Sequence, residues 1–151
     1  MDPLVIYAAG LFDGEGSVSA NVIRKTNYNV DLFIGMTCPH AVLKLRKRFG
    51  GGIYVNHHEK RNPKHRPEFC WFLSSAAASR FLRAIRPYVI VKKDEVETAL
   101  TLQDHIDKWR GRLIWYGRRD HAKRDAILAY RAKLKQRLID LKHLDYGNTP
   151  P

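Results

Sequence analysis

The sequence predicts an α+β domain in which helices cover one face of an antiparallel sheet. Helical and alternating segments follow one another in the order helix, hairpin, helix, hairpin, helix, helix. The alternating segments keep one face apolar and one polar, so the sheet is expected to present its polar face to solvent or a ligand. At 151 residues, the chain is long enough to form one domain with a substantial core.

The opening segment is a helix that leads into an acidic, glycine-rich corner. Residues 3–13 have proline at an early position behind Asp2, a preferred capping residue, and apolar side chains at helical spacing. The glycines of residues 13–16, which read DGEG, are expected to end this helix. The two carboxylates of the corner therefore lie at the carboxyl end of the helix, where its dipole disfavours negative charge.

Alternation with a period of two predicts two hairpins. The first has a short connection, Thr26-Asn27-Tyr28, and the second has a long basic turn over residues 59–66. In the first hairpin, small polar and amide side chains take the face opposite the valines and leucines. The four strands are expected at residues 17–26, 29–37, 53–58 and 68–73.

Helical spacing returns between and after the hairpins. Three consecutive glycines stop the second helix, and Pro87 separates the third from the fourth. A last long helix with many basic residues is expected to end at Gly147, with Pro150 and Pro151 frayed. These helices are expected at residues 39–49, 74–86, 92 or 94 to 109, and 120–144.

The charge balance indicates a polyanionic partner. Lysine and arginine total 27 against 15 acidic residues, which gives a net charge of +12 and a pI near 10. Nucleic acid is favoured, because each neutralised phosphate releases a condensed counterion. An anionic membrane is less favoured because no clear basic amphipathic helix opens the chain, and a merely solvated basic surface is the structural alternative.

Two cysteines favour an intracellular protein without a disulfide framework. No apolar stretch approaches the span of a bilayer, and the Asp2-Pro3 start argues against a usual signal peptide, so we expect neither membrane insertion nor secretion. Cytoplasm, nucleoid or a host organelle all fit. A zinc site is disfavoured, because the spacing of its candidate ligands matches no compact finger: Cys38, His40, His57, His58, His65 and Cys70.

Residues 8–16, AAGLFDGEG, resemble the signature of the LAGLIDADG homing endonucleases. The family core has the same order of elements, and residues 86–92, RPYVIVK, resemble the family segment in which a Pro-aromatic pair precedes a basic residue. The resemblance covers about residues 3–107. It implies an endonuclease core over residues 1–109 whose sheet forms a DNA-binding saddle. Residues 110–151 have no counterpart and are expected to form a basic, mainly helical extension packed on the core. A role in a dimer or on flanking DNA is the alternative for its apolar stripe.

The resemblance implies a metal-dependent site at the glycine-rich corner. Glu15 corresponds to the acid that binds the metal, and the Gly14 carbonyl is a candidate second ligand. Mg²⁺ is the expected ion, with Mn²⁺ or Ca²⁺ as substitutes in vitro. Lys92 matches the family's basic residue near the active site, although Lys93 leaves the register open by one. Asp13 is interpreted as a brace of the turn.

A single copy of the motif implies a homodimer, because two such helices must pack side by side to bring one acid to each DNA strand. Ala9, Gly10 and Asp13 are small or short residues at close helical spacing and are expected at the dimer interface. A twofold dimer implies a long, palindromic or pseudo-palindromic target.

The polar strand faces are expected to read base edges in a major groove, which admits a two-stranded ribbon. The basic turn is expected to hold phosphates, which position the protein without specifying sequence. Ile23 and Phe33 are apolar on the polar face and are candidates for contact with thymine methyl groups or for simple shielding of the sheet. The expected DNA-binding residues are Ser17, Ser19, Asn21, Lys25, Asn29, Asp31, Tyr54, Asn56, His58, Lys60, Arg61, Lys64, Arg66 and Glu68, with His65 beside them in the turn.

The function that follows is site-specific double-strand DNA cleavage, as in intron homing. The alternative is an RNA maturase or intron-splicing cofactor, or a non-cleaving DNA-binding protein on the same scaffold. The sequence departs from the family at Cys38, where a polar residue is usual at the end of the second strand. That departure concerns the organisation of water at the site and not the metal ligand.

Overall fold

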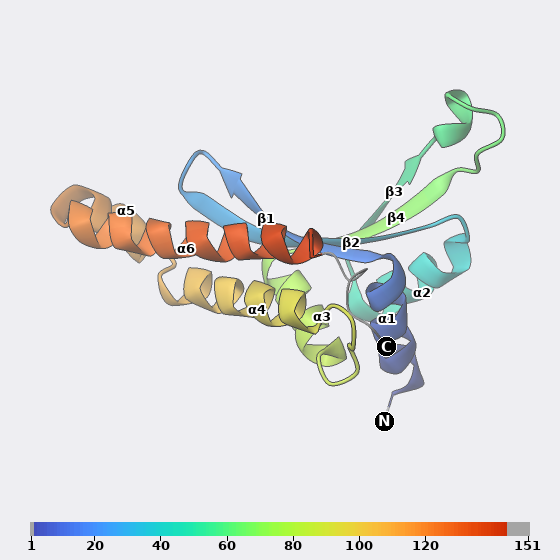
Figure 1. The fold of residues 1–151 in the computed structure, drawn as a ribbon, viewed down its shortest axis with the longest axis horizontal. Helices are drawn as coiled ribbons and strands as arrows, with labels where there is room; N and C mark the ends of the chain where they lie inside the picture. Colours follow the sequence, from blue (N-terminus) through green and yellow to red (C-terminus); the bar gives the residue numbers. More distant parts are fainter. Residues whose placement is uncertain (1, 145–151) are drawn as a thin grey trace.

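The computed structural model describes residues 2–144 and confirms the α+β prediction. Helices pack against one face of a four-stranded antiparallel sheet (Figure 1). No helix in this described range has an apolar stretch long enough to cross a bilayer. The elements are α1 (Pro3–Glu15), β1 (Gly16–Ile23), β2 (Asn27–Met36), α2 (Pro39–Phe49), β3 (Gly52–Asn56), the 3₁₀ helix η1 (His58–Lys60), β4 (Glu68–Ser74), α3 (Ser75–Ile85), α4 (Lys93–Lys108), α5 (Arg112–Arg119) and α6 (His121–Lys142).

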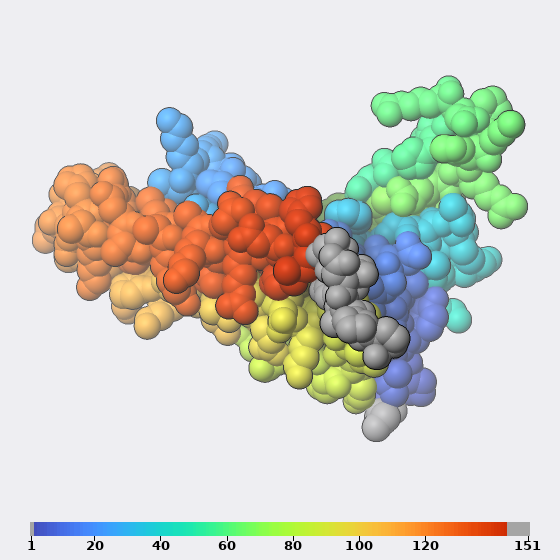
Figure 2. Space-filling view, viewed as in Figure 1, coloured from blue at the N-terminus to red at the C-terminus, as the bar shows by residue number. Residues whose placement is uncertain are grey.

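The sheet forms a saddle. Its strand order is β1-β2-β4-β3, so the two hairpins meet along β2 and β4 at the centre. The hairpin ends project at opposite ends of the molecule (Figure 1). Figure 2 shows the hollow between these two projections. An open surface of this kind suits a long ligand lying across the strands.

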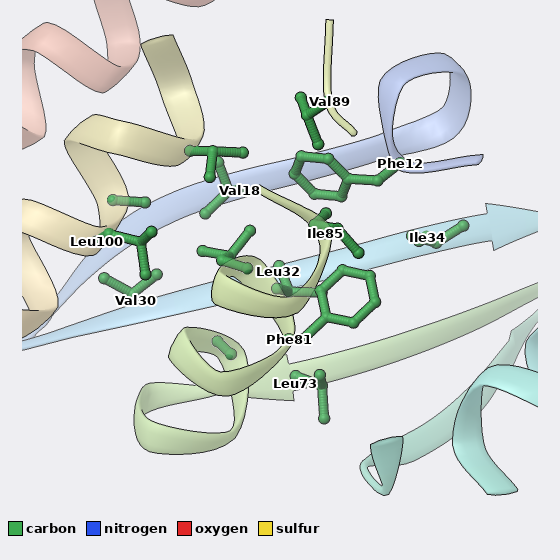
Figure 3. Packing of buried hydrophobic residues seen from close by; sticks show 14 of the residues in the cluster. Phe12, Val18, Val30, Leu32, Ile34, Leu73, Phe81, Ile85, Val89 and Leu100 are labelled. Carbon is green, nitrogen blue, oxygen red and sulfur yellow. The ribbon is translucent and has the colours of Figure 1, made fainter. Parts of the chain in front are cut away.

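Aromatic side chains join α1, α3 and the sheet in the core. Phe81 of α3 makes edge-to-face contacts with Phe12 of α1, with ring centroids 6.2 Å apart, and with Trp71 of β4 at 5.0 Å. All three residues are at most 1% exposed. Figure 3 shows Phe12 and Phe81 among the aliphatic side chains of β1 and β2. Because Phe12 lies one turn before the acidic corner, the core fixes the position of that corner.

The last helix packs along the β1 edge of the sheet and on α4 (Figure 1). Leu134 and Leu138 belong to the main hydrophobic core. The predicted helix at residues 120–144 is therefore observed with nearly the expected bounds, while its predicted end at Gly147 and the frayed prolines lie outside the described residues. The short α5 is an addition to the prediction, and it follows Gly111, which has a φ of 75° in the left-handed region.

Two predicted boundaries at the corner and the first hairpin are wrong. Helix α1 continues to Glu15, and Gly16 follows in an extended conformation with a φ of −79°. A side chain at Gly16 would lie 2.6 Å from the carbonyl oxygen of Phe12, so glycine is needed for close approach and not for a left-handed turn. Strand β1 stops at Ile23, because Lys25 adopts a φ of 65° and belongs to the turn.

The second hairpin also departs from the prediction. Strand β3 ends at Asn56, and the chain then forms η1. His58 and Lys60 were expected on the strand face, but both lie in this 3₁₀ turn, so strand alternation does not apply to them.

Candidate functional site

Glu15 lies at the end of α1 with its carboxylate open to solvent. The residue is exposed, and no hydrogen bond or ion pair of its side chain occurs within residues 2–144. Gly14 beside it is exposed as well, and no atom lies within 4 Å of the position where a Cβ would be. A carboxylate at a helix C-terminus is unfavourable on its own, so this corner favours a bound cation.

Asp13 braces the corner from inside, as the interpretation of the turn predicted. Its carboxylate accepts hydrogen bonds from the backbone N–H groups of Ile90 at 2.7 Å, Val91 at 3.3 Å and Lys92 at 3.0 Å. These N–H groups precede α4, whose N-cap residue makes no capping bond with its own side chain. The end of α1 therefore holds the segment that leads into α4.

Lys92 lies at the corner, but its ammonium contacts the protein backbone. It donates to the carbonyl oxygens of Gly16 at 2.6 Å and Phe12 at 3.1 Å, and it lies 5.7 Å from the centroid of the Phe12 ring. These carbonyls belong to the last turn and C-cap of α1, where helices leave acceptors unsatisfied. Lys93 is the exposed first residue of α4. Lys92 is thus the basic residue that the fold holds in place.

The structure adds Lys142 and Glu95 to this corner. Lys142, at the end of α6, donates to the hydroxyl of Ser17 at 2.9 Å across 125 positions of sequence (Figure 1 shows this end of α6 beside the start of β1). Residue 142 is exposed as a whole, yet protein groups surround its ammonium, and this desolvation lowers its pKa. Glu95 is buried, and burial raises its pKa although Lys142 and Lys92 act in the opposite direction.

The raised pKa of Glu95 gives a testable pH dependence. The pKa of Glu95 in the folded protein lies above the ordinary value of 4.5. The contribution of Glu95 to the free energy of unfolding is therefore full below pH 4.5 and is lost as the pH rises through the pKa of the folded protein. We expect Glu95→Gln to gain stability relative to the parent between pH 4.5 and neutrality. Urea unfolding of both proteins across this range measures the difference. Asp140→Asn, at an exposed acid of α6, is the control, and a difference that shrinks with rising pH would contradict the expectation.

The ligands at the corner fit a hard divalent cation only in part. The Glu15 carboxylate and the Gly14 carbonyl are oxygen donors of the kind that Mg²⁺ prefers. Within residues 2–144, no group of three His, Cys, Asp or Glu side chains is arranged to hold a metal. One chain thus offers fewer ligands than an octahedral ion requires, and the rest must come from water, phosphate or a second copy.

The outward face of the sheet carries a hydrogen-bonded polar network. The Asp31 carboxylate accepts from the Asn21 amide at 2.6 Å and the Asn29 amide at 2.8 Å. At the other end, Glu68 accepts from Asn56 at 3.1 Å, and this bond is the main cause of its lowered pKa. The network fixes donors and acceptors on the predicted reading face. Ser17 and Ser19 lie on the same face through their pairing with Phe33 and Asp31.

An aromatic patch occupies the centre of this polar face. Phe33 and Phe72 are paired across β2 and β4, and the Tyr54 ring lies 5.9 Å from that of Phe72. Each of the three is between 41% and 45% exposed. Tyr54 and Phe33 were predicted on this face, and Phe72 was not. Alternation of residues 68–73 would also have predicted Phe72 there.

Basic residues gather on the turns that form the two projections of the saddle. Lys25 lies in the β1–β2 turn beside Arg24. Arg61, Lys64 and Arg66 are all exposed in the β3–β4 connection, with His58, Lys60 and His65 around them. This arrangement separates a polar centre from basic ends.

One of the three expected dimer contacts is wrong, because Ala9 is fully buried in its own core. The Asp13 carboxylate is bound to its own chain, and its contact with a second copy stays a prediction. Gly10 is exposed, with no atom within 4 Å of a built Cβ. The exposed face of α1 also carries Ile6, 41% exposed, and Tyr7, 47% exposed. Cys38, aligned with a polar family residue, lines a hollow with Pro3, Leu4 and Tyr7 beside the first half of α1, and not the Glu15 corner.

Solved structures share this architecture. No protein-family model matches the chain, and no curated protein matches it by sequence. The homing endonuclease I-CvuI, in a complex with uncleaved target DNA and Mg, aligns over 97% of this chain and 85% of its own with a TM-score of 0.66 and 16% identity. The archaeal intron-encoded homing endonuclease I-Vdi141I, in complex with DNA, aligns over 97% and 88% with a TM-score of 0.67 and 16% identity.

A double mutant of I-SmaMI aligns over 99% of this chain but only 46% of its own, with a TM-score of 0.56 and 15% identity. At these identities the similarity concerns the fold. This chain therefore has the fold of the LAGLIDADG homing endonucleases.

Proposed function

We propose that this protein is a site-specific double-strand DNA endonuclease that acts as a homodimer on a long pseudo-palindromic target. One observation carries the proposal: the exposed Glu15 carboxylate lies where the concave polar sheet meets the exposed face of α1. DNA lying in the saddle and a second copy on α1 would both reach this point. Lys92 and Lys142 lie at the same corner and supply positive charge for phosphate.

Binding of duplex DNA is supported by the form and chemistry of the saddle. The basic turns at its two ends suit backbone phosphates, and the polar centre suits base edges. The structural neighbours I-CvuI and I-Vdi141I are in complex with DNA. The aromatic patch of Phe33, Tyr54 and Phe72 offers apolar contact at the centre, where thymine methyl groups are suitable partners.

A divalent metal, most simply Mg²⁺, completes the proposed site. When bound, it supplies a nucleophile at neutral pH and neutralises charge on the phosphate. Glu15 and the Gly14 carbonyl would hold it from one subunit. Asp13 keeps the corner in place through its bonds ahead of α4, and Lys92 fixes the carbonyls at the end of α1. Lys142 is close enough to Ser17 to hold a phosphate at the start of β1.

The homodimer is supported by the face of α1 that the fold leaves uncovered. Gly10 and Gly14 lie on it, one helical turn apart, and both are open to close approach by another backbone. Tyr7 and Ile6 extend the same exposed side. Because the chain spans 46% of the I-SmaMI double mutant, two copies would match the length of such a longer chain.

The proposal is tested by selecting cleaved molecules from a randomised duplex library with the full chain and Mg²⁺. We expect recovery of one long site with twofold symmetry. Recovery of bound but uncut duplexes would favour a non-cleaving DNA-binding protein instead. Preferential binding of structured RNA over every duplex would favour the maturase alternative. Intron homing as the biological setting is part of the same proposal and follows only if the site is recovered.

Lys142 provides a prediction that the resemblance alone does not make. Lys142→Gln is expected to slow cleavage about tenfold and to lower the salt slope of DNA binding by about one, because one phosphate contact is lost. Lys133→Gln, an exposed lysine of the same helix, is the matched control. Single-turnover cleavage and binding at several salt concentrations measure both effects. Equal behaviour of the two variants would remove Lys142 from the site.

A further inference from the structure

A cavity of about 590 Å³ lies away from the Glu15 corner. It is open to solvent and is lined by residues of the β1–β2 turn, the start of α3, the end of α4, and helices α5 and α6. Figure 1 shows the α5 end of the molecule near the tip of the first hairpin. The volume falls within the range of about 300 to 1,000 Å³ that is usual for small-molecule sites. Nothing in the proposed DNA cleavage uses this cavity.

Arg131 of α6 lines the cavity as a buried cation. It is only 4% exposed, and no acidic side chain pairs with it among residues 2–144. Its Nε donates to Nδ1 of His105 at 3.4 Å, and no hydrogen bond of its two terminal amino groups occurs in that range. Burial and the neighbouring Arg131 lower the pKa of His105, which keeps its ring neutral and able to accept. An isolated buried charge is costly, so this site favours an anion.

Gln103 of α4 contributes a second buried polar group. It is 1% exposed, and its Oε1 has no hydrogen-bond partner in the described part of the chain, residues 2–144, while its Nε2 donates to Asp107 at 3.1 Å. A buried acceptor without a donor is also unfavourable. A ligand that carries an N–H or O–H group beside its anionic group would satisfy both residues.

The lining combines positive charge with flat apolar walls. Arg110 and Arg124 line the cavity in addition to Arg131, but each also forms an ion pair, Arg110 with Asp107 and Arg124 with Asp125. Arg131 is the lining arginine without an acidic partner among residues 2–144, and no aspartate or glutamate lines the cavity itself. A phosphate has oxygens enough to accept from Arg131 and from an arginine that exchanges its carboxylate partner. Trp109 and Tyr28 provide aromatic surface for a ring. The cavity thus has one charged part and one aromatic part.

We propose that this cavity binds a small organic phosphate of mononucleotide size, with the phosphate on Arg131 and a planar ring against Trp109. Gln103 Oε1 accepts from the ligand. Because Arg131 is almost fully buried, a free small molecule reaches it more readily than a phosphate on a rigid duplex. The proposal is independent of DNA cleavage.

Titration calorimetry of the full chain with adenosine and cytidine monophosphates tests the proposal. Arg131→Met removes the buried guanidinium, and Ala76→Trp places a large side chain at an exposed position of the cavity lining. Arg137→Met, at an exposed arginine of α6, is the matched control. We expect at least about tenfold weaker binding for the first two and a change within about twofold for the control. Thermal unfolding without ligand should show Arg131→Met folded and no less stable than the parent.

Several results would overturn the proposal. Absence of binding by the parent at millimolar nucleotide is one, and equal weakening by Arg137→Met is another. Inorganic phosphate binding as tightly as the nucleotides would show that the aromatic walls play no part. If Arg131→Met weakened duplex DNA binding as much as nucleotide binding, the cavity would belong to a flanking DNA phosphate and not to a small ligand.

Discussion

Replacing Glu15 with glutamine is expected to slow DNA cleavage by about a hundred- to a thousandfold or more and to leave DNA binding within about twofold. The reason is that glutamine keeps the size of the side chain but loses the charge that holds the metal. Stability should not fall, because the Glu15 side chain is exposed and makes no hydrogen bond or ion pair within residues 2–144. Removing a negative charge from a helix C-terminus is itself slightly favourable.

Single-turnover cleavage in Mg²⁺ measures the expected loss of rate in Glu15→Gln, and DNA binding in Ca²⁺ measures the expected retention of affinity. Asp140→Asn is the control for loss of one exposed acid. Cleavage by Glu15→Gln within a few-fold of the parent would remove Glu15 from the site. Loss of binding together with cleavage would make it a DNA contact and not a metal ligand.

Replacing Asp13 with alanine is expected to lower the free energy of unfolding by about 3 kcal/mol. The change leaves the backbone N–H groups of Ile90, Val91 and Lys92 without their shared acceptor. Asp13→Asn should cost about half as much, because its amide oxygen still accepts one bond. The alanine variant should also cleave at least about tenfold more slowly, since the corner that presents Glu15 loses its brace.

Urea unfolding and single-turnover cleavage at a temperature where each Asp13 variant is folded separate these two effects. Asp94→Ala, an exposed acid in the first turn of α4, is the control, with an expected loss of less than about 1 kcal/mol. A loss by Asp13→Ala no larger than that of the control would show that the three hydrogen bonds contribute little.

The order of elements could be predicted because hydrophobic periodicity is local. Alternation placed Asp31 and Phe33 on the outward face, and the structure keeps them there. Boundaries failed where the backbone adopts an unusual conformation. Lys25 has a left-handed backbone conformation and lies in the turn after β1, and the strand before His58 is followed by a 3₁₀ helix. The side-chain pattern predicts neither of these two strand ends.

The face of α1 could not be predicted from its own residues. The helix has large hydrophobic side chains on more than one side, with Ile6 and Tyr7 exposed and Val5 and Phe12 buried. Small size alone suggested Ala9 for close approach to a second helix. Packing of Phe12 against α3 determines which face of α1 is buried, because it places Ala9 in the core and leaves Gly10 exposed.

The resemblance to the family motif predicted a functional site at the glycine-rich corner, but it did not predict every residue that lies there. Asp13 and Lys92 could be placed there by resemblance, and the structure brings them into hydrogen-bond contact. Lys142 could not be placed at the corner from the sequence. Helical periodicity predicts which face of α6 is buried, but it does not predict which residue of another element contacts the end of α6. The contact with Ser17 depends on how the whole helix lies along β1.

In the proposed homodimer, each chain contributes half of an active site and cuts one strand of a symmetric duplex. Mapping the cut positions on both strands of a site recovered from the randomised library tests this most directly. We expect one cut on each strand in the presence of Mg²⁺, with the two positions related by the twofold axis of the site. Cuts on a single strand, or scattered cuts without that symmetry, would contradict it.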